Sequence, residues 1–238
     1  MTAEQRSVGY GTQVIDFSII RRNRITLEIA VESDASVRVV APFDATPETI
    51  DAKVRKRAAW IKRQQRFFKL FLPRTPERRF VGGETHLYLG RQHRLKIRKG
   101  EQEGVKLARG FIIVTLRDPE SSRRVELLID QWYRERAYLK FAERLEASLG
   151  RFSDPGSYRP KRLSIRKMKQ RWGSMSVRGQ LLLNLRLIEA PSNAIDYVIT
   201  HELCHVKENN HGPRFHALLS KVMPDWQKRK ERLERILA

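Results

Sequence analysis

The sequence predicts an α+β fold, with a mostly antiparallel β region and one helix in the N-terminal half, and a helical region with a β-hairpin in the C-terminal half. Alternating apolar and polar residues recur before residue 118, and a long amphipathic pattern covers residues 122–149. A second helical pattern carries His-Glu-Leu-Cys-His at residues 201–205. We therefore expect a β-rich region over residues 1–118 and a closely packed second region over residues 119–238.

The N-terminal half reads as strands, then a helix, then strands. Apolar and polar residues alternate over 14–20, 25–31 and 37–41, which predicts a meander with one solvent-facing side. Thr46–Pro47 is typical of a helix start, and the spacing of the following apolar residues gives that helix a core-facing stripe. Further strands are expected over 84–97 and 105–116, turning at Gly90 and at Arg109–Gly110.

The second half reads as helices around a short hairpin. A long helix is expected from Ser122 to Leu149, ended by Gly150, with a loop over residues 153–160. Residues 163–165 and 181–187 are expected to pair as a hairpin that turns near Arg178–Gly179.

Composition favours one compact enzyme. The chain has 238 residues, of which 40% are apolar, so it can bury a substantial core. Its one cysteine, Cys204, excludes an internal disulfide, favours a reducing compartment and is expected to be a small buried hydrophobe. A secretory apolar segment is missing, and so is a run of about 18 apolar residues. We expect a cytoplasmic protein without a membrane partner.

The His-Glu-Leu-Cys-His motif has the spacing of a metal site. On a helix, His201 and His205 lie one turn apart, with about 6 Å between their side-chain bases, so both can bind one metal ion. Glu202 lies about 100° round the helix axis from His201, within reach of a metal-activated water. The motif stands on a helix that begins near Pro191–Ser192 and carries a core-facing stripe that includes Val206.

His211 is the expected third ligand. It follows the helix-ending residues Glu208-Asn209-Asn210 and precedes Gly212–Pro213, so the chain can turn back towards the metal. Its distance from His201 equals that between the first and last histidines of the pattern His-Glu-x-x-His-x-x-Gly-x-x-His. His216 is expected to be a packed histidine or a neighbour of the ligands, on a helix that starts near Gly212.

The chain resembles the YgjP-like metal-dependent hydrolases, relatives of the SprT and WLM metallopeptidases. The resemblance covers most of the chain and is carried by Arg171-Trp172-Gly173-Ser174, 183–187, 195–205, Asn210-His211-Gly212, Phe215 and Pro224-Asp225. The family usually has Cys at the position of Met175 and Trp at the position of His216. The resemblance implies a zincin-like C-terminal region, and members of the family are described as metallopeptidases or as nucleoside-triphosphate pyrophosphatases.

The ligand set predicts a mechanism. Three neutral imidazoles, His201, His205 and His211, leave a fourth position at Zn²⁺ for water, and Glu202 is expected to act as the general base. Arg171 and Asn184 are candidates for stabilising the charge that develops on the substrate oxygen. The alternative reading of these two is structural, with the arginine pairing with a carboxylate and Asn184 closing a turn.

The net charge of +21 indicates a polyanionic partner or a solvated basic surface. Two stretches without acids carry much of it, namely residues 53–69 and residues 159–171. The cations of the second stretch that are expected to meet phosphates are Arg159, Lys161, Arg162, Arg166, Lys167 and Lys169.

The reaction class has three readings. A zinc-dependent metallopeptidase acting on proteins or peptides leads, because a Glu base within His-Glu-x-x-His is overwhelmingly a peptidase arrangement. Nucleoside-triphosphate pyrophosphate hydrolysis at the same metal is the alternative that the charge favours. A nucleic-acid-associated protein with structural zinc is the third, and it requires a fourth protein ligand from Glu208, Cys204 or His216.

Overall fold

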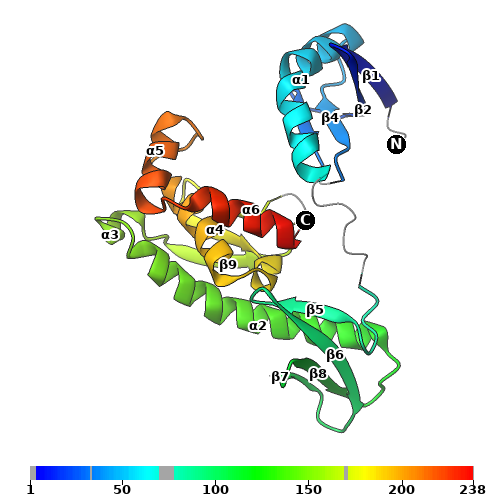
Figure 1. Ribbon diagram of the computed structural model, residues 1–238, viewed down its shortest axis with the longest axis vertical. Coiled ribbons are helices and arrows are strands. Elements are labelled where there is room, and N and C mark those ends of the chain that lie inside the picture. The colour runs from blue at the N-terminus through cyan, green and yellow to red at the C-terminus, as the bar shows by residue number, and fades with distance from the viewer. Residues whose placement is uncertain (1–3, 33, 70–77, 169–170, 238) are drawn as a thin grey trace. The chain divides into compact units, whose positions relative to one another are not determined.

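The computed structural model describes residues 4–32, 34–69, 78–168 and 171–237. These residues form six α-helices and three sheets, each sheet mixing parallel and antiparallel pairs, which confirms the α+β class. The chain divides into two compact units, residues up to 76 and residues 77–237 (Figure 1). We describe each unit by itself.

The first unit is a four-stranded sheet followed by a helix. Its elements are β1 (Glu4–Tyr10), β2 (Gln13–Arg21), β3 (Glu28–Val31), β4 (Val37–Ala41) and α1 (Pro47–Lys69). The expected meander is wrong, because the strand order is β1-β2-β4-β3 and β2 pairs with β4 in parallel. Alternation indicated which side of each strand is buried, but it could not indicate which strands are neighbours.

The helix α1 covers one face of this sheet. It begins at Pro47 as predicted, and its buried residues are Ile50, Val54, Ala58 and Ile61. These side chains pack with the inward residues of the strands, among them Ile15, Phe17 and Val39, into a core that belongs to the first unit alone. The remaining circumference of α1 stays outside that core.

The second unit begins with the same topology. Its elements β5 (Thr85–Tyr88), β6 (Arg91–Lys99), β7 (Gly104–Ala108), β8 (Phe111–Leu116) and α2 (Ser122–Leu149) form a sheet of order β5-β6-β8-β7 followed by a helix. The predicted turns at Gly90 and Arg109–Gly110 are confirmed. The four turn residues, Leu89, Gly90, Arg109 and Gly110, all have positive φ. Such two-residue turns match the twist of a hairpin.

The helix α2 connects this sheet to the rest of the unit. It runs from Ser122 to Leu149, as expected, and at 28 residues it is about 42 Å long. Ser121 caps its N-terminus and Gly150 its C-terminus. Its buried side chains contact the β5–β8 sheet and also α4 (Ser192–Cys204). The two compact units divide near residue 77, because β5–β8 pack on α2, and the expected regions 1–118 and 119–238 stay a prediction.

A small third sheet lies beside α4. It contains β9 (Arg162–Arg166), β10 (Gly173–Met175) and β11 (Gln180–Asn184), in the order β10-β11-β9, after the short helix α3 (Pro155–Tyr158). The expected pairing of 163–165 with 181–187 as a hairpin is wrong, because β9 and β11 are parallel. The hairpin is β10–β11, and residues 185–189 form the 3₁₀ helix η1 (Leu185–Glu189). This arrangement puts β10 at the edge of the sheet.

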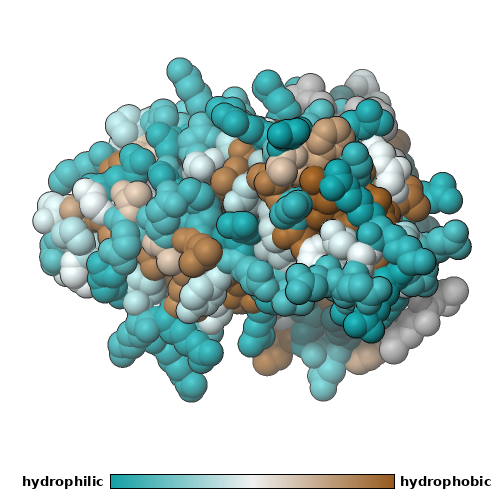
Figure 2. Space-filling model, turned by 90° about the horizontal axis from the view of Figure 1, so that it is seen from below, coloured by the Kyte–Doolittle hydropathy of each residue, from teal (hydrophilic) through white to brown (hydrophobic). Residues whose placement is uncertain are grey.

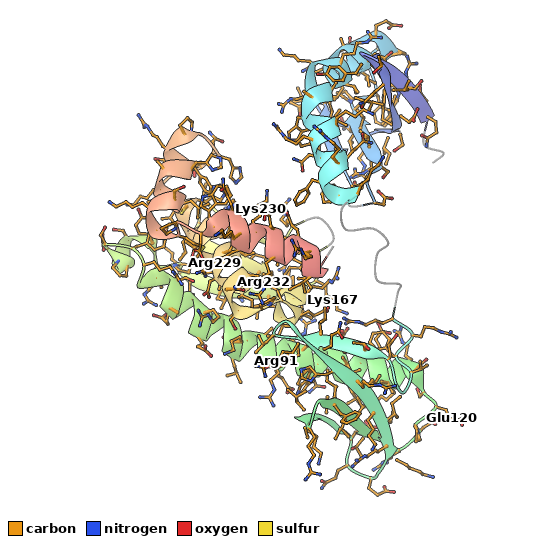
Figure 3. All side chains as sticks on the ribbon, viewed as in Figure 1. Arg91, Glu120, Lys167, Arg229, Lys230 and Arg232 are labelled. Carbon is orange, nitrogen blue, oxygen red and sulfur yellow. The ribbon has the colours of Figure 1, made fainter. Side chains whose placement is uncertain are left out.

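Three helices complete the unit: α4, α5 (Pro213–Val222) and α6 (Trp226–Leu237). Asp196 of α4 is nearly buried and receives two 2.6 Å hydrogen bonds from Arg144 of α2. Arg229 of α6 lies 3.5 Å from the same carboxylate (Figure 3). Because a buried carboxylate requires compensating charge, this cluster ties α4 to both neighbouring helices.

The helix α4 begins as predicted, but it ends before Val206, the last residue of the expected apolar stripe. The helix ends at Cys204, with His205 as its C-cap, so Val206 lies beyond it and is exposed rather than in the core. Cys204 is fully buried, as expected, and burial raises its pKa to about 12.

The surface is strongly polar. Figure 2 shows hydrophilic side chains over most of one face, with hydrophobic residues in smaller patches, in keeping with a chain of which 32% is charged. None of the helices in the described part of the chain combines the length and the apolar character that a membrane crossing requires.

Candidate metal centre

Three histidine side chains meet at one point in the second unit. The Nε2 atom of His211 lies 2.9 Å from that of His201 and 3.1 Å from that of His205. Among the described residues, these three form the only group of His, Cys, Asp and Glu side chains that could hold a metal ion, with ligand atoms within 4.8 Å of one another. The structure thus brings together the three predicted ligands.

The turn after α4 orients two of these rings. His205 Nδ1 lies 2.9 Å from the carbonyl oxygen of Glu208. Because a carbonyl oxygen only accepts, Nδ1 must carry the proton, which leaves the lone pair on Nε2 directed at the other two histidines. The same turn is closed by the Glu208 backbone N–H, which donates to the Cys204 carbonyl at 3.0 Å, and it returns the chain to His211.

Phe215 of α5 forms an apolar floor beneath the three rings. Its side chain is fully buried, and its ring centroid lies 4.9 Å from that of His201, 4.6 Å from His205 and 4.7 Å from His211. Sequence reasoning did not assign this residue a role, although its position three residues after Gly212 on an amphipathic helix could have indicated an inward side chain.

The environment favours the neutral imidazole at His201 and His211. Burial, followed by the neighbouring His211 and His205, lowers the pKa of His201 to about 3. Burial, followed by the neighbouring His205, His216 and Lys230, also lowers the pKa of His211. Neutral imidazole is the form that coordinates metal ions, so the centre is prepared for a cation rather than for protons.

The donor set fits a zinc-type cation. Three lone-pair nitrogens that converge without an intervening positive charge repel one another, and a bound cation removes that repulsion. With Zn–N bonds of 2.0–2.1 Å, tetrahedral ligands stand about 3.3 Å apart, close to the observed Nε2 separations. Magnesium and calcium prefer oxygen ligands, which this group of three does not include.

Glu202 lies beside the histidines on the β10 side of α4. Its side chain is nearly buried, and burial raises its pKa to about 7. A hydrogen bond from the Met175 backbone and the positive charge of Arg171 act in the opposite direction. The surroundings of Glu202 therefore bring the pKa of its carboxyl group close to neutral pH, which suits a general base.

Gly173 in β10 leaves room for this carboxylate. A Cβ at Gly173 would stand 2.8 Å from Glu202 Cγ, 3.0 Å from its Oε1 and 3.1 Å from Val198 Cγ1. The resemblance singled out this glycine in Arg-Trp-Gly-Ser, but only the tertiary structure gives a physical reason for it: the strand and the catalytic carboxylate candidate are in direct contact.

We expect Gly173→Ala to lower hydrolysis roughly 10- to 100-fold, because the added methyl group pushes the Glu202 carboxylate out of the position from which it can accept a proton. Zinc content should stay unchanged, since no histidine is touched. The matched control is Gly104→Ala in β7, where an added Cβ meets nothing within 4 Å. The two variants are compared by their rate of hydrolysis of denatured casein and by metal analysis of the same samples. Equal activity in both variants would contradict this account.

The structure separates the other two candidate residues. Arg171 is exposed and lines the cleft beside the histidines. Asn184 is nearly buried, and its amide donates to the carbonyls of Met168 at 2.8 Å and Arg171 at 3.0 Å. Its side-chain oxygen accepts from the Arg186 backbone at 3.2 Å. Asn184 thus links the backbones of Met168, Arg171 and Arg186.

A cleft of about 470 Å³ opens over the centre. The three histidines and Glu202 line it on the α4 side, and β10 with Arg171 and Trp172 on the other. Tyr197 and Asn209, which sequence reasoning did not assign, also line it.

The three proposed sources of a fourth ligand stand away from this point. Glu208 contributes its backbone carbonyl to His205, and Cys204 is buried in the core. His216 is exposed, and its ring stacks on Trp226 with centroids 5.6 Å apart. None of them joins the group of three among the described residues.

The second basic stretch is partly neutralised. Arg159 pairs with Glu146 at 2.5 Å, and Lys167 pairs with Asp130 of α2 (Figure 3). Lys169 lies outside the described residues. These ion pairs reduce the charge that this stretch offers to phosphates, and a nucleic-acid partner here stays a prediction.

An α+β fold with three convergent histidines beside a buried carboxylate is the arrangement of a metal-dependent hydrolase. Residues 25–236 match the family model described as YgjP-like, metallopeptidase domain. Because this match covers nearly the whole sequence, the chain belongs to that family, and the resemblance noted from its motifs is confirmed. The search of the curated proteins and the search of the solved structures found no match.

Proposed function

We propose that this protein is a zinc-dependent metallopeptidase with His201, His205 and His211 as metal ligands and Glu202 as general base. The observation that carries the proposal is the convergence of three Nε2 atoms, 2.9 and 3.1 Å apart, beside a buried glutamate. Family membership supports a hydrolase with a metal cofactor and a peptidase-like substrate.

The bound metal would act as a Lewis acid that polarises the scissile carbonyl and lowers the pKa of a water molecule. Glu202 accepts the proton that this water loses as it attacks, and then transfers it to the leaving amine. Its raised pKa of about 7 suits both steps, because a base of this strength is partly ionised at neutral pH and can also return the proton.

The edge strand β10 favours an extended peptide as substrate. The Trp172 carbonyl accepts from Asn184 and the Ser176 N–H donates to Gln180, so the even-numbered residues of this segment turn their backbone groups to β11. In an antiparallel ladder the alternate residues turn theirs away, and the hydrogen bond from Met175 to Glu202 follows this rule. The backbone groups of Gly173 and the carbonyl of Met175 are therefore directed away from β11, where a peptide strand can pair with them, whereas the Met175 N–H already binds Glu202.

Arg171 is proposed to stabilise the negative charge that develops on the substrate oxygen. Among the described residues that line the cleft it is the one Lys or Arg, and it comes from the segment that leads into β10. Asn184 is proposed to support this role indirectly, because its amide holds the Arg171 backbone at 3.0 Å. Arg171→Ala should therefore lower turnover, whereas Asn184→Ala should also lower stability.

Parallel assays of the zinc-loaded protein test the proposal. We expect hydrolysis of denatured casein that chelation with EDTA abolishes and added Zn²⁺ restores, while nucleoside triphosphates are left intact. Release of pyrophosphate with casein untouched would overturn the peptidase assignment in favour of nucleotide hydrolysis. Stoichiometric zinc without activity on either substrate class would favour a structural zinc.

A further inference from the structure

The outer side of α1 carries an unbalanced row of positive charges. Between residues 52 and 69 the sequence has no acid. We call the cations of this segment the α1 basic face: Lys53, Arg55, Lys56, Arg57, Lys62, Arg63, Arg66 and Lys69. All of them are exposed except Lys62, which is half-buried.

Acidic side chains do not compensate these charges. Within the described part of the chain, the α1 basic face takes part in no ion pair, and Lys62 donates to the Val14 carbonyl at 2.7 Å. On α2, by contrast, Arg124, Lys140 and Arg144 each pair with a carboxylate. Like charges three and four residues apart destabilise a helix, so a bound polyanion would relieve a cost already present in α1.

The described residues cover less of α1 than of α2. Both helices follow a four-stranded sheet of the same topology. The described residues bury ten side chains of α2, because α4 and η1 cover it as well as the sheet, but they bury only four of α1.

A hollow of about 370 Å³ adjoins this face, between α1 and the start of β3. It is lined by Leu27, Ile29, Lys53, Lys56, Arg57 and Trp60. The indole ring of Trp60 is half-buried against the core of the first unit, and three cations surround the apolar wall. A second hollow of about 460 Å³ lies by the β1–β2 turn and combines Tyr10 with Lys62 and Arg66.

We propose that the α1 basic face, with Trp60 in its hollow, binds single-stranded nucleic acid. An aromatic ring on an apolar wall offers a surface on which an unpaired base can stack, and flanking cations neutralise the adjoining phosphates. A duplex hides its base faces in the stack and would leave Trp60 without a role. The site belongs to the first unit and uses no residue of the candidate metal centre, so it is independent of the proposed peptidase activity.

The test uses the full-length, zinc-loaded protein and a fluorescein-labelled oligothymidylate of about 15 nucleotides. Binding is measured by fluorescence anisotropy over a range of KCl concentrations. We expect the logarithm of affinity to fall by about 0.7 for each phosphate neutralised per log unit of salt. The triple variant Lys53→Glu, Lys56→Glu, Arg57→Glu should lower affinity at least roughly 100-fold and flatten the salt slope, with zinc content unchanged.

A matched triple variant controls for net charge. Arg98→Glu, Lys99→Glu, Lys106→Glu changes the charge equally, at exposed residues on β6 and β7 of the second unit. We expect it to retain most of the affinity. An equal loss in both triple variants would overturn the proposal, because binding would then follow overall charge and not the α1 basic face.

Trp60 variants test the base-stacking part. Trp60→Leu should weaken binding roughly 5- to 100-fold without altering the salt slope, and Trp60→Phe should recover much of it. Circular dichroism identifies any variant that fails to fold. If Trp60→Leu fails to fold, the affinity of Trp60→Phe still tests whether an aromatic ring at this position supports binding. Equal binding of a duplex, or equally strong competition by polyglutamate, would overturn single-strand recognition in favour of a general polyanion surface.

Discussion

Replacing His201, His205 or His211 by alanine should in each case remove most of the zinc that the purified protein retains, from about one ion per chain to a small fraction of it after dialysis. The expectation rests on the convergence of the three Nε2 atoms within hydrogen-bonding distance. With one ligand gone, two imidazoles remain, which form a weak site. Atomic absorption of the dialysed variants, with an equal protein concentration throughout, provides the measurement.

The matched control is His216→Ala. His216 stands five residues beyond His211, is exposed and stacks on Trp226 rather than on the ligands. The zinc content of the His216→Ala variant should equal that of the unchanged protein. If the His211 variant kept its zinc and the His216 variant lost it, the ligand set would be wrong at its third member, and Phe215 would no longer mark the floor of the centre.

Metal removal should also lower thermal stability. A ligand that binds only the folded state raises stability by about 4 kcal/mol when its concentration is a thousandfold above its dissociation constant. We expect EDTA to lower the melting temperature of the unchanged protein and to leave the three histidine variants almost unaffected. The two measurements together separate loss of metal from loss of fold.

Glu202→Gln should reduce hydrolysis by roughly two to four orders of magnitude while zinc content stays near that of the unchanged protein. Glutamine has nearly the same shape and can still accept the hydrogen bond from the Met175 backbone, but it cannot take a proton from water. Because Glu202 is nearly buried, a change of the same size avoids a cavity at the centre.

Glu208→Gln is the matched control for this change. Glu208 lies in the turn after α4 and contacts His205 through its backbone carbonyl, which the substitution leaves in place. Its activity should therefore be close to that of the unchanged protein. Full casein hydrolysis by the Glu202 variant would remove this residue from the role of base and would point to water activated by the metal alone.

Several local features could be predicted from the sequence because neighbouring residues decide them. The long helix from Ser122 to Leu149, the start of α4 and the turns at Gly90 and Gly110 all follow from caps, glycines and apolar spacing. The approach of His201 and His205 follows equally from one helical turn. The return of His211 was also predicted, since the helix-ending residues lie directly before it.

Strand pairing could not be predicted in this way. The expected meander and the expected hairpin at 163–187 both failed where strands distant in sequence pair in parallel, as β2 with β4 and β9 with β11. Alternation reports only which side of a strand is buried, and several pairings bury the same side equally well. Choosing among them depends on how helices close over the sheets.

By itself, the sequence determined the candidate site of this protein: a histidine and glutamate pattern on a helix and a third histidine after a turn, together with an excess of positive charge. These are local properties, since spacing and residue type suffice to predict them. Only the tertiary structure decided that Gly173 lies against Glu202, that Phe215 lies under the three rings and that the α1 basic face makes no ion pair with the described residues. Each of these depends on which distant segments pack together, and packing is a property of the whole chain.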